Sequence, residues 1–515
     1  MSCRQMAISR KREHMKTDIL PQHHEELLRA KLSETSLPLI INGERVAGGG
    51  EQLTVTNPSD ATVLTRSASA TVEDVDQAVR AARAAFEDGP WQRMTPAERQ
   101  DLLWRFADTL EDALDELAAL ESLNCGKPYQ VVRQFELPAG IKLLRYHAGW
   151  ATKLNGETRD VSLPGSWQAF TVRQPVGVAG LIVPWNVPFN IALSKVAPAL
   201  AAGCTVVLKP AELTPLTAVR MAELALEAGI PPGVLNVVQG LGAVAGQAIA
   251  DHPEVDKVSF TGSTAVGRRL LQSAAGNLKR LSLELGGKSP VVIYPDADLS
   301  EAIPAAAMSI FANSGQVCAA GSRLYVHEEV AEEVIAGVAK IAESLTLGPG
   351  LDPEATMGPL ISEQQCERVL QYIAEGIADG AELVTGGARL DREGYFVQPT
   401  VLRDAKPHMS IVQEEIFGPV LAVSTFSNED SLTDVLRQAN DTEYGLNSII
   451  FTKDISRALQ FAQRIQAGNV RINAGSGMDA NMPFGGFKAS GWGYENGREG
   501  VEAYTALKSV AIKLA

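Results

Sequence analysis

The chain has 515 residues, of which 45% are hydrophobic and 21% are charged, and its formal net charge is −15. This length exceeds what one hydrophobic core usually supports, so we expect two or three lobes. The negative charge argues against a nucleic-acid partner and against an anionic membrane surface as a partner.

The cysteines and histidines exclude further classes of site. The five cysteines are scattered and form no CxxC pair; they are Cys3, Cys125, Cys204, Cys318 and Cys366. This usage argues against a disulfide framework and a zinc site, and it favours a cytoplasmic location. The seven histidines show no metal-ligand spacing, so we expect no metal. No stretch reaches about 18 consecutive apolar residues, and we expect no membrane span.

The N-terminal part begins with a basic leader that lacks the apolar core of a secretory signal. We interpret 1–35 as a flexible arm, with a transit peptide as the alternative. From Leu37 the chain becomes apolar and glycine-rich, as short strands would. Thr71-Val72-Glu73-Asp74 and Thr95-Pro96-Ala97-Glu98 are capping boxes that predict two helix starts. The helical region from Thr95 to about Tyr146 contains no group of chemically active residues, and we interpret it as scaffold.

Residues 155–174 differ from their surroundings. They are polar around Leu163-Pro164-Gly165, a pattern that predicts a hairpin standing off the body. Protruding hairpins often pair with a partner subunit. The last strand-like segment of the chain, Ala506–Leu514, could pair with this hairpin, including across a subunit interface.

Apolar strands and helical segments alternate after the hairpin. We expect strands at Gly177–Val183, Thr205–Leu208, Val234–Val238, Lys257–Phe260 and Leu281–Leu283. This is the βαβ rhythm of a doubly wound α/β fold with a parallel sheet. Such sheets bind ligands at the carboxyl ends of their strands, so the residues after each strand are candidates for a dinucleotide site.

Three features that follow these strands fit a dinucleotide. The segment 258–267 runs from a strand through a glycine turn into a helix start, which suits a pyrophosphate. The run 240–246 approaches the GxGxxG fingerprint but has one residue too many. Lys209 could bridge ribose hydroxyls, and Glu212 could accept from the 2′-hydroxyl, which favours NAD over NADP. The alternative for this pair is a surface ion pair of little energetic weight.

The stretch 281–322 combines an acid and a thiol on glycine-flanked backbone. Glu284 ends an apolar run just before Gly286-Gly287, and Cys318 lies between two further glycines. A thiol and a carboxyl group in such a setting can serve as a nucleophile and as a separate general base. The alternatives are a buried structural cysteine and a solvated turn glutamate.

A second alternating region follows Ser322 and leads to a rigid, glycine-rich turn at Pro483–Gly486, which could shape a pocket. Seven motifs now stand along the chain: PWNVPFN (184–190), KPAELTP (209–215), FTGST (260–264), LELGGK (283–288), SGQVCAA (314–320), EEIFGPV (414–420) and PFGGFKASG (483–491). In this order and spacing they occur in the aldehyde dehydrogenases, a family that the sequence resembles over about residues 37 to 515.

The resemblance implies a fold and a division into domains. The fold is α/β, with a Rossmann-type NAD-binding domain at 36–152 and 175–286, an α/β catalytic domain at 287–488, and a small β oligomerisation unit at 153–174 and 489–515. It also implies a homodimer or homotetramer and a small-molecule aldehyde as substrate. NAD is the implied cofactor, with NADP as the less favoured alternative.

The motifs also imply roles for single residues. Cys318 resembles the nucleophile, Glu284 the general base and Asn186 the oxyanion donor, while Lys195 and Glu495 match accessory polar positions. The implied cofactor contacts are Val183, Trp185, Asn186, Lys209, Glu212, Gly242, Gly262, Ser263, Leu285, Gly286, Gln365, Glu415 and Phe417. A thiolate that adds to an aldehyde leaves an oxyanion; oxidation then gives a thioester, which an activated water hydrolyses.

Two positions depart from the family pattern. Tyr494-Glu495 stands where members often have Arg-Glu, which puts an interface salt bridge in doubt. Ser194 stands where many members carry a tunnel tryptophan; the other tunnel candidates are Val187, Ile191, Gly477, Met478 and Phe484. These tunnel candidates include no cation or carboxylate, which favours a hydrophobic aldehyde, aromatic or terpenoid-like. Simple packing of these residues is the alternative.

Two other functions stay open. One is a coenzyme-A-acylating aldehyde dehydrogenase, although relatives of that branch usually lack a glutamate at the position of Glu284. The other is a catalytically silent NAD-binding structural protein, against which the joint presence of Cys318, Glu284 and Asn186 argues.

Overall fold

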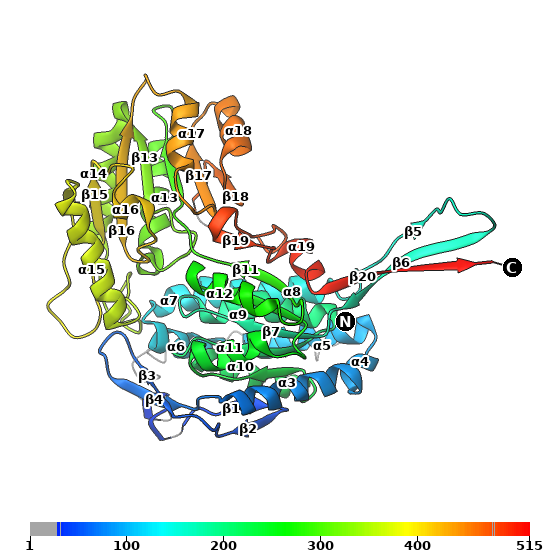
Figure 1. The fold of residues 1–515 in the computed structure, drawn as a ribbon. Coiled ribbons are helices and arrows are strands. Elements are labelled where there is room, and N and C mark those ends of the chain that lie inside the picture. Colours follow the sequence, from blue (N-terminus) through cyan, green and yellow to red (C-terminus); the bar gives the residue numbers. More distant parts are fainter. Residues whose placement is uncertain (1–27, 31, 35, 476, 478, 515) are drawn as a thin grey trace, which may run out of the picture.

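The structure is a computed structural model that describes residues 28–30, 32–34, 36–475, 477 and 479–514. Its strands form sheets of eight, seven, three and two strands over these ranges. Figure 1 shows the eight-stranded sheet in the lower lobe, the seven-stranded sheet in the upper lobe, and the three-stranded sheet as a projecting arm. Most of the predicted flexible arm, 1–35, lies outside the described residues.

The eight-stranded sheet has the order β19-β11-β10-β7-β8-β9-β1-β2. Its centre is parallel and consists of β7 (Val178–Ile182), β8 (Thr205–Lys209), β9 (Leu235–Val237), β10 (Lys257–Thr261) and β11 (Arg280–Glu284). Each overlaps a strand expected from the sequence, so the predicted doubly wound α/β fold is confirmed. The antiparallel edge strands are β1 (Leu39–Ile41), β2 (Glu44–Val46) and β19 (Gly491–Trp492).

Side chains of the central strands alternate between two cores, because successive residues of a strand point to opposite faces. Ala179 and Leu181 of β7 pack with α5 (Pro96–Asp112), α6 (Leu114–Cys125), α8 (Leu137–Ala148), α9 (Pro188–Ala202) and α10 (Leu216–Glu227). Val178 and Ile182 pack with α3 (Val72–Glu87), α11 (Gln247–Asp251) and α12 (Thr264–Ala274). Helices therefore cover both faces, which explains why the central strands are apolar throughout.

The seven-stranded sheet has the order β14-β15-β16-β13-β12-β17-β18 and is parallel except at β14. Its strands are β12 (Pro290–Ile293), β13 (Arg323–His327), β14 (Glu382–Thr385), β15 (Thr400–Arg403), β16 (Val420–Phe426), β17 (Asn447–Phe451) and β18 (Asn469–Ile472). The helices are α13 (Leu299–Phe311), α14 (Glu328–Ser344), α15 (Glu363–Ala378), α16 (Ser410–Gln413), α17 (Leu432–Asn440) and α18 (Ile455–Arg464). Shorter elements elsewhere are α4 (Pro90–Arg93), α7 (Tyr129–Val131), α19 (Gly497–Glu502), β3 (Leu53–Thr56) and β4 (Val63–Ser67).

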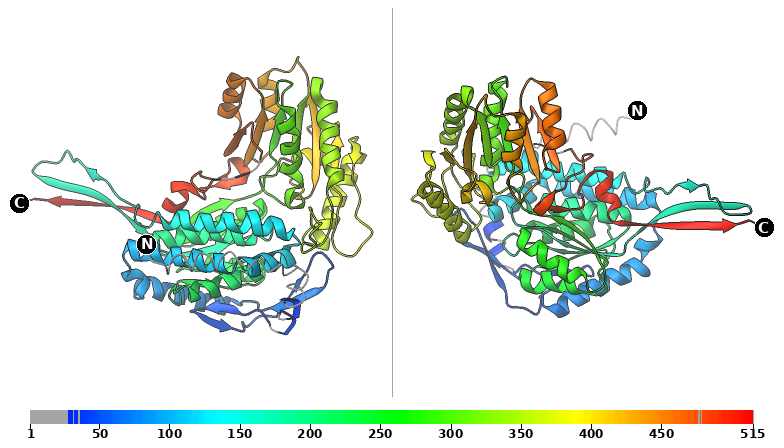
Figure 2. Two further views of the ribbon diagram at one scale, coloured as in Figure 1. Left: turned by 180° about the vertical axis from the view of Figure 1, so that it is seen from behind. Right: turned by 45° about the horizontal axis from the view of Figure 1, so that its top comes forward.

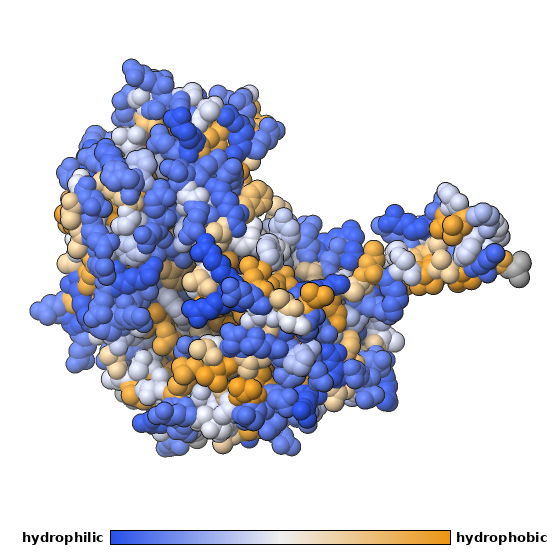
Figure 3. Space-filling view, in the orientation of Figure 1, coloured by the Kyte–Doolittle hydropathy of each residue, from blue (hydrophilic) through white to orange (hydrophobic). Residues whose placement is uncertain are grey.

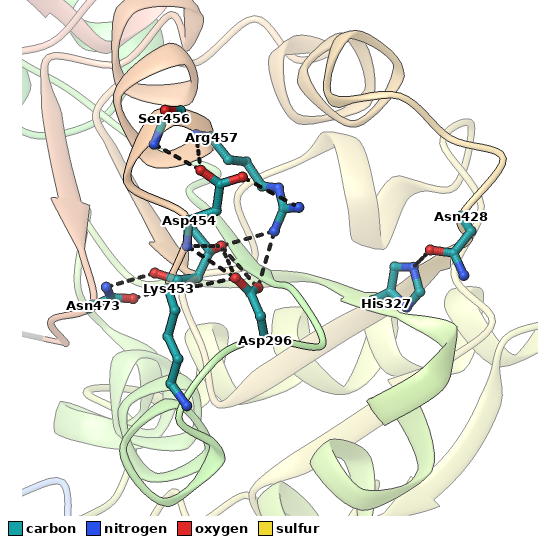
Figure 4. A network of polar contacts seen from close by, with 9 residues as sticks. Asp296, His327, Asn428, Lys453, Asp454, Ser456, Arg457 and Asn473 are labelled. Atoms are coloured by element: carbon teal, nitrogen blue, oxygen red, sulfur yellow. Dashed lines mark hydrogen bonds and ion pairs between the residues drawn. The ribbon is translucent and has the colours of Figure 1, made fainter.

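The ends of β12 and β17 and the start of α18 are joined through Asp296 (Figure 4). Its carboxylate accepts from Thr452 Oγ1 at 2.9 Å, Lys453 N at 3.0 Å and Arg457 Nη1 at 3.1 Å. Burial opposes ionisation here, but the bond from Thr452 and the charge of Arg457 outweigh it, and the pKa of Asp296 lies below its usual value. This network ties the segments that follow β12 and β17 to the start of α18.

The arm consists of β5 (Thr158–Arg159), β6 (Trp167–Pro175) and β20 (Thr505–Lys513). β20 pairs antiparallel with β6 along its whole length, from Thr505 opposite Pro175 to Lys513 opposite Trp167. The predicted hairpin and its pairing with the last strand are confirmed, and the pairing forms within one chain. All views in Figures 1 and 2 show the arm extending away from both lobes.

The predicted division of the chain into domains stays a proposal. One detail differs in placement: β19 belongs to the segment assigned to the oligomerisation unit, yet it pairs with β11 in the eight-stranded sheet. Among the described residues, no helix is both long and apolar enough to cross a bilayer. The cytoplasmic location stays a prediction.

The helix α3 covers one face of the eight-stranded sheet, and its N-terminal cap can be tested by substitution. Thr71 Oγ1 accepts from Asp74 N at 3.2 Å, and the Asp74 carboxylate accepts from Thr71 N at 2.8 Å, so the predicted capping box of α3 is present. Thr71→Ala should lower the free energy of unfolding by about 1 kcal/mol, because an N–H of the first turn loses its partner. Urea unfolding followed by circular dichroism measures this. Thr71→Ser keeps the oxygen and should stay close to the parent; equal loss in both variants would contradict the capping argument.

Candidate active site

The exit of β11 brings three parts of the chain together. Glu284 is the last residue of β11, and Gly286-Gly287 follow it. A Cβ at Gly286 would lie 2.4 Å from Glu415 Oε2, and one at Gly287 would lie 2.3 Å from Cys318 O. Both distances are far shorter than a real contact, so only glycine lets this backbone pass. The glycines therefore seat the β11 exit directly against the Cys318 loop and Glu415.

The turn before Cys318 has an unusual backbone. Asn313 (φ 49°), Ser314 (φ 55°) and Gly315 (φ 73°) are consecutive left-handed residues, a conformation that costs energy for the two non-glycine residues. Tertiary hydrogen bonds hold it: Ser314 Oγ donates to Gly358 O at 2.7 Å, and Ile361 N donates to Gln316 Oε1 at 2.9 Å. The loop that presents Cys318 is thus shaped by neighbours rather than by its own preference.

Asn186, which follows β7, is attached to the same loop. It is 4% exposed, its Nδ2 donates to Gln316 O at 2.8 Å, and its own carbonyl accepts from Asn313 Nδ2 at 3.0 Å. An amide NH₂ carries two donors, so a second N–H is left for a ligand. This placement suits the predicted oxyanion donor, a role that stays a prediction.

Cys318 has a weakly acidic thiol in this structure. The side chain is half-buried. Burial first, and then the negative charges of Glu415 and Glu284, raise its pKa to about 12, while a bond from Ala319 N–H opposes the shift. Little thiolate exists at neutral pH under these conditions, so a proton acceptor or an added positive charge is needed before Cys318 can act as a nucleophile.

Glu284 is a buried carboxyl group without a protein partner. It is 3% exposed, and neither of its oxygens has a hydrogen-bond partner among the described residues. Burial and then the charge of Glu495 raise its pKa well above the ordinary value, and Lys195 opposes them. The ionised form of such a carboxyl group is a stronger base than an ordinary carboxylate, and its fraction increases with pH.

Lys195 and Glu495 form a buried ion pair in the same region. Lys195 is fully buried, contacts Glu495 Oε1, and donates to Ser259 Oγ at 3.0 Å. Ser194 Oγ lies 2.9 Å from the other carboxylate oxygen of Glu495. The two accessory positions predicted from the motifs are therefore in direct contact.

A cleft of about 240 Å³ connects Cys318 with the ends of the strands. Ten of the predicted site residues line it: Trp185, Asn186, Gly262, Ser263, Leu285, Gly286, Cys318, Gln365, Glu415 and Phe417. They come from loops after β7, β10 and β11, from the Cys318 loop, from α15 and from the segment before β16. The cleft thus unites residues that are far apart in the sequence.

The walls of the cleft offer several kinds of contact. The rings of Trp185 and Phe417 meet edge to face with centroids 5.2 Å apart. Gln365 Nε2 donates to Phe417 O at 2.9 Å, which holds Phe417 in a left-handed backbone (φ 60°). Ser263 is the N-cap of α12 and accepts from Val266 N at 3.4 Å. Burial raises the pKa of Glu415 to about 7. Aromatic faces, a carboxylate and a helix N-terminus could hold a dinucleotide.

Four predicted cofactor residues lie outside this cleft: Val183, Lys209, Glu212 and Gly242. Lys209 is 2% exposed, and its Nζ donates to Pro210 O at 2.9 Å and lies 3.4 Å from Glu212 Oε2. The ion pair considered as the alternative is therefore present, and burial lowers the pKa of Lys209. The Glu212 side chain is 40% exposed and can still reach a ligand.

The predicted tunnel residues are not brought to the cleft. Val187 and Ile191 are half-buried, Ser194 and Phe484 are buried, and Gly477 is exposed. None of these five lines the cleft, and Met478 lies outside the described residues. The tunnel stays a prediction.

The cleft also contains Pro184 and Thr261, which belong to the motifs at 184–190 and 260–264, and Arg368, which the sequence reasoning missed. Arg368 follows Gln365 by three residues on α15, and its Nη2 donates to Glu415 O at 2.9 Å. Helical i, i+3 spacing could have pointed to it, because such residues share one face. No cluster of three His, Cys, Asp or Glu residues with metal-binding geometry occurs in the described part of the chain.

Comparisons with known proteins find relatives along almost the whole chain. A sequence model described as the aldehyde dehydrogenase family matches residues 46–510. A phenylacetaldehyde dehydrogenase of Pseudomonas fluorescens is 48% identical over 481 residues, which span 92% of this chain and 95% of the relative. The NAD⁺ complex of an aldehyde dehydrogenase from Bacillus cereus superposes with a TM-score of 0.92 at 45% identity, covering 94% and 98% of the two chains.

An indole-3-acetaldehyde dehydrogenase of P. syringae, solved with NAD⁺, superposes with a TM-score of 0.92 at 42% identity, covering 95% of this chain and 99% of that one. These likenesses extend over nearly the whole chain and include both lobes. The resemblance inferred from the seven motifs is confirmed, and the chain belongs to the aldehyde dehydrogenase family.

Proposed function

We propose that this protein oxidises a hydrophobic aldehyde to the carboxylic acid with NAD⁺, through a covalent intermediate on Cys318. The observation that carries the proposal is the cleft that joins Cys318 and Asn186 to the residues after the parallel strands. A nucleophile, an amide donor and the loops that follow parallel strands meet in one cleft, as aldehyde oxidation with a dinucleotide requires.

The residues present fit a dinucleotide. A Cβ at Gly262 would lie 2.4 Å from the Phe260 ring, and one at Gly286 would lie 2.4 Å from Glu415 Oε2, so a larger residue at either position would displace these walls of the cleft. Ser263 and the start of α12 would take the pyrophosphate, and Glu415 would take a ribose hydroxyl. When bound, NAD⁺ supplies the hydride acceptor that the oxidation requires.

Cys318 would start the reaction by bonding through Sγ to the aldehyde carbon. Its thiol must first lose a proton, which is unfavourable with a pKa near 12; the Glu284 carboxylate, whose charge acts on this thiol, is a proton acceptor. The Asn186 amide and the Cys318 backbone N–H would stabilise the oxyanion, and each such donor typically contributes about 3–4 kcal/mol to catalysis.

Glu284 would act a second time in hydrolysis. After oxidation, Cys318 carries a thioester, and water must attack it. Glu284 takes the proton from this water, and the carboxylic acid leaves while the Cys318 sulfur is released. Because the pKa of Glu284 is raised, the fraction of its ionised form grows as the pH increases, so hydrolysis should accelerate toward alkaline pH.

The substrate class is supported by residue chemistry and by relatives. The predicted tunnel positions hold no charged residue, which disfavours a charged aldehyde. The relatives described above act on phenylacetaldehyde and indole-3-acetaldehyde, according to their names. An aryl-substituted aldehyde is therefore the first substrate to test, and the terpenoid-like class is the second.

We also propose a homodimer or homotetramer built through the arm. Hydrophobic side chains gather along β20 at the lower edge of the arm in Figure 3. Leu507 is 55% exposed and Ile512 is 43% exposed, and both lie on a sheet of only three strands. A small projecting sheet with exposed apolar residues needs a covering partner.

The central test follows reduced cofactor by its absorbance. Purified protein, NAD⁺ and aldehydes of aliphatic, aromatic and charged type are mixed without coenzyme A. We expect turnover that is highest with arylacetaldehydes and is lost in Cys318→Ala, because no covalent intermediate can form. Glu284→Gln should still release one equivalent of reduced cofactor in a burst and then accumulate a thioester, visible as an acyl mass on Cys318.

The remaining outcomes separate the alternatives. Turnover only when coenzyme A is added would assign the protein to the acylating branch. NAD⁺ binding in calorimetry, with no turnover of any aldehyde under either condition, would favour the structural role and remove the catalytic proposal.

Cofactor preference can be tested at Glu212. Its carboxylate should repel the 2′-phosphate of NADP⁺, so Glu212→Ser should raise kcat/KM for NADP⁺ about tenfold or more, equivalent to about 1.4 kcal/mol. The same change should lower kcat/KM for NAD⁺. Glu254, on the same lobe but outside the strand ends, provides a charge-matched control as Glu254→Ser. Unchanged preference in Glu212→Ser would remove this residue from cofactor selection.

The arm can be tested by molar mass in solution. Light scattering after gel filtration should give two or four times the chain mass of 54.9 kDa. Leu507→Lys should shift the mass toward the monomer, since it buries a charge in the proposed interface. Lys508→Ala, next to it on β20 and also exposed, is the control. A monomeric parent would contradict the proposal.

A further inference from the structure

Ser194 makes a contact that its predicted place in the substrate tunnel does not explain. It lies in the middle of α9 and is 8% exposed, and its Oγ lies 2.9 Å from Glu495 Oε2. The two residues are 301 positions apart in the chain. The other oxygen of the same carboxylate contacts Lys195. Neighbouring residues of one helix therefore hold both oxygens of Glu495.

We propose that Ser194 is a positioning residue that holds the Glu495 carboxylate against Lys195 and beside Glu284. The inference rests on the proposed function, because it assigns Ser194 a part in setting the proton-accepting state of Glu284. It concerns orientation only: Ser194 would touch neither the aldehyde nor the cofactor.

The hydroxyl group suits this task because it can donate or accept. Ser194 Oγ lies 2.9 Å from Glu495 Oε2 and 2.9 Å from Ile191 O, but it has a single hydrogen. Ser194 can donate this hydrogen to the Glu495 carboxylate or to Ile191 O, and the donation to Glu495 is the one that holds the carboxylate in place.

Several charged groups surround this contact. Lys195 donates to Ser259 Oγ on β10, and Ser259 lies opposite Ser282, which is two residues before Glu284 on the same face of β11. At this position the charge of Glu495 raises the pKa of Glu284 and that of Lys195 lowers it. Lys257, whose pKa is lowered to about 8 by burial and by Lys195, lies on β10 next to this pair. The Tyr504 ring lies under Lys257 Nζ, 4.9 Å from the ring centroid. Glu495 is the acid in this group that raises the pKa of Glu284.

Removing the Ser194 hydroxyl group should lower the pKa of Glu284. Ser194→Ala leaves Glu495 bound at one oxygen, so its carboxylate gains freedom to turn away from Glu284. The negative charge beside Glu284 then weakens, and the pKa of Glu284 falls. Because the ionised form is the active base, the rise of hydrolysis with pH should move to lower pH.

The experiment measures hydrolysis of the thioester directly. Acyl-Cys318 is formed with one equivalent of aldehyde and NAD⁺ in the full-length enzyme, and its decay is followed by rapid quench and mass spectrometry across the pH range. In Ser194→Ala we expect the midpoint of the decay profile to move down by about 0.5 pH unit or more. Ser194→Thr keeps the hydroxyl and should restore the parental midpoint.

Two further variants separate positioning from general damage. Ser344 on α14 donates to Ile341 O at 2.8 Å in the same helical manner, so Ser344→Ala should leave the midpoint unchanged. Glu495→Gln should lower the midpoint, and adding Ser194→Ala to it should produce no further shift. If Ser194→Ala does not fold, Glu495→Gln and Ser194→Thr still test the link.

The outcomes are distinct from those of the proposed function. A parental enzyme that forms no acyl-Cys318 would overturn the proposed function. An active parent whose midpoint is the same in Ser194→Ala, or a Ser194→Thr variant that behaves like Ser194→Ala, would overturn the positioning role alone.

Discussion

The close approach of the Gly286-Gly287 backbone to Cys318 and Glu415 is the constraint on which the site depends. Hypothetical Cβ atoms at these glycines would lie 2.4 and 2.3 Å from Glu415 Oε2 and Cys318 O. Glu284 ends β11 of the eight-stranded sheet, whereas the Cys318 loop precedes β13 of the seven-stranded sheet. Two residues without side chains thus join the two sheets at the point where chemistry is proposed.

The second constraint is electrostatic. The region around Cys318 concentrates buried carboxyl groups, and their burial raises the pKa values of Glu284 and Glu415 and that of the thiol. Such an arrangement costs stability, because buried ionisable groups lose hydration. The buried Lys195 offsets part of this cost through Glu495. Strained backbone at Asn313 and Ser314 adds to the cost, and hydrogen bonds from neighbouring segments compensate for it.

Local signals in the sequence were reliable where the structure depends on near neighbours. The capping box at Thr71 is present, and each of the five central strands lies where its apolar run predicted it. The glycine turn after β10 does lead into a helix, with Ser263 as its N-cap. Such features involve residues within a few positions of one another, so their energetics can be inferred from composition and spacing alone.

Contacts between segments that are far apart in the chain were harder to predict from the sequence. The pairing of Ser194 with Glu495 could not be anticipated, because a helix position says nothing about which residue 301 positions later faces it. Lys209 and Glu212 illustrate another limit: Lys209 is buried and its Nζ lies 3.4 Å from Glu212 Oε2, while their contact with a ribose stays a prediction.

The α/β architecture, the order of the strands along the chain and the membership in the aldehyde dehydrogenase family could all be predicted from the amino-acid sequence, since they depend on periodicity and on motifs with fixed spacing. The three-dimensional fold was needed to show which of the predicted residues share the Cys318 cleft, that β20 pairs with β6 within one chain, and which groups surround Glu284. The physical reason is that burial and charge interactions depend on distances in space, which a linear pattern does not contain.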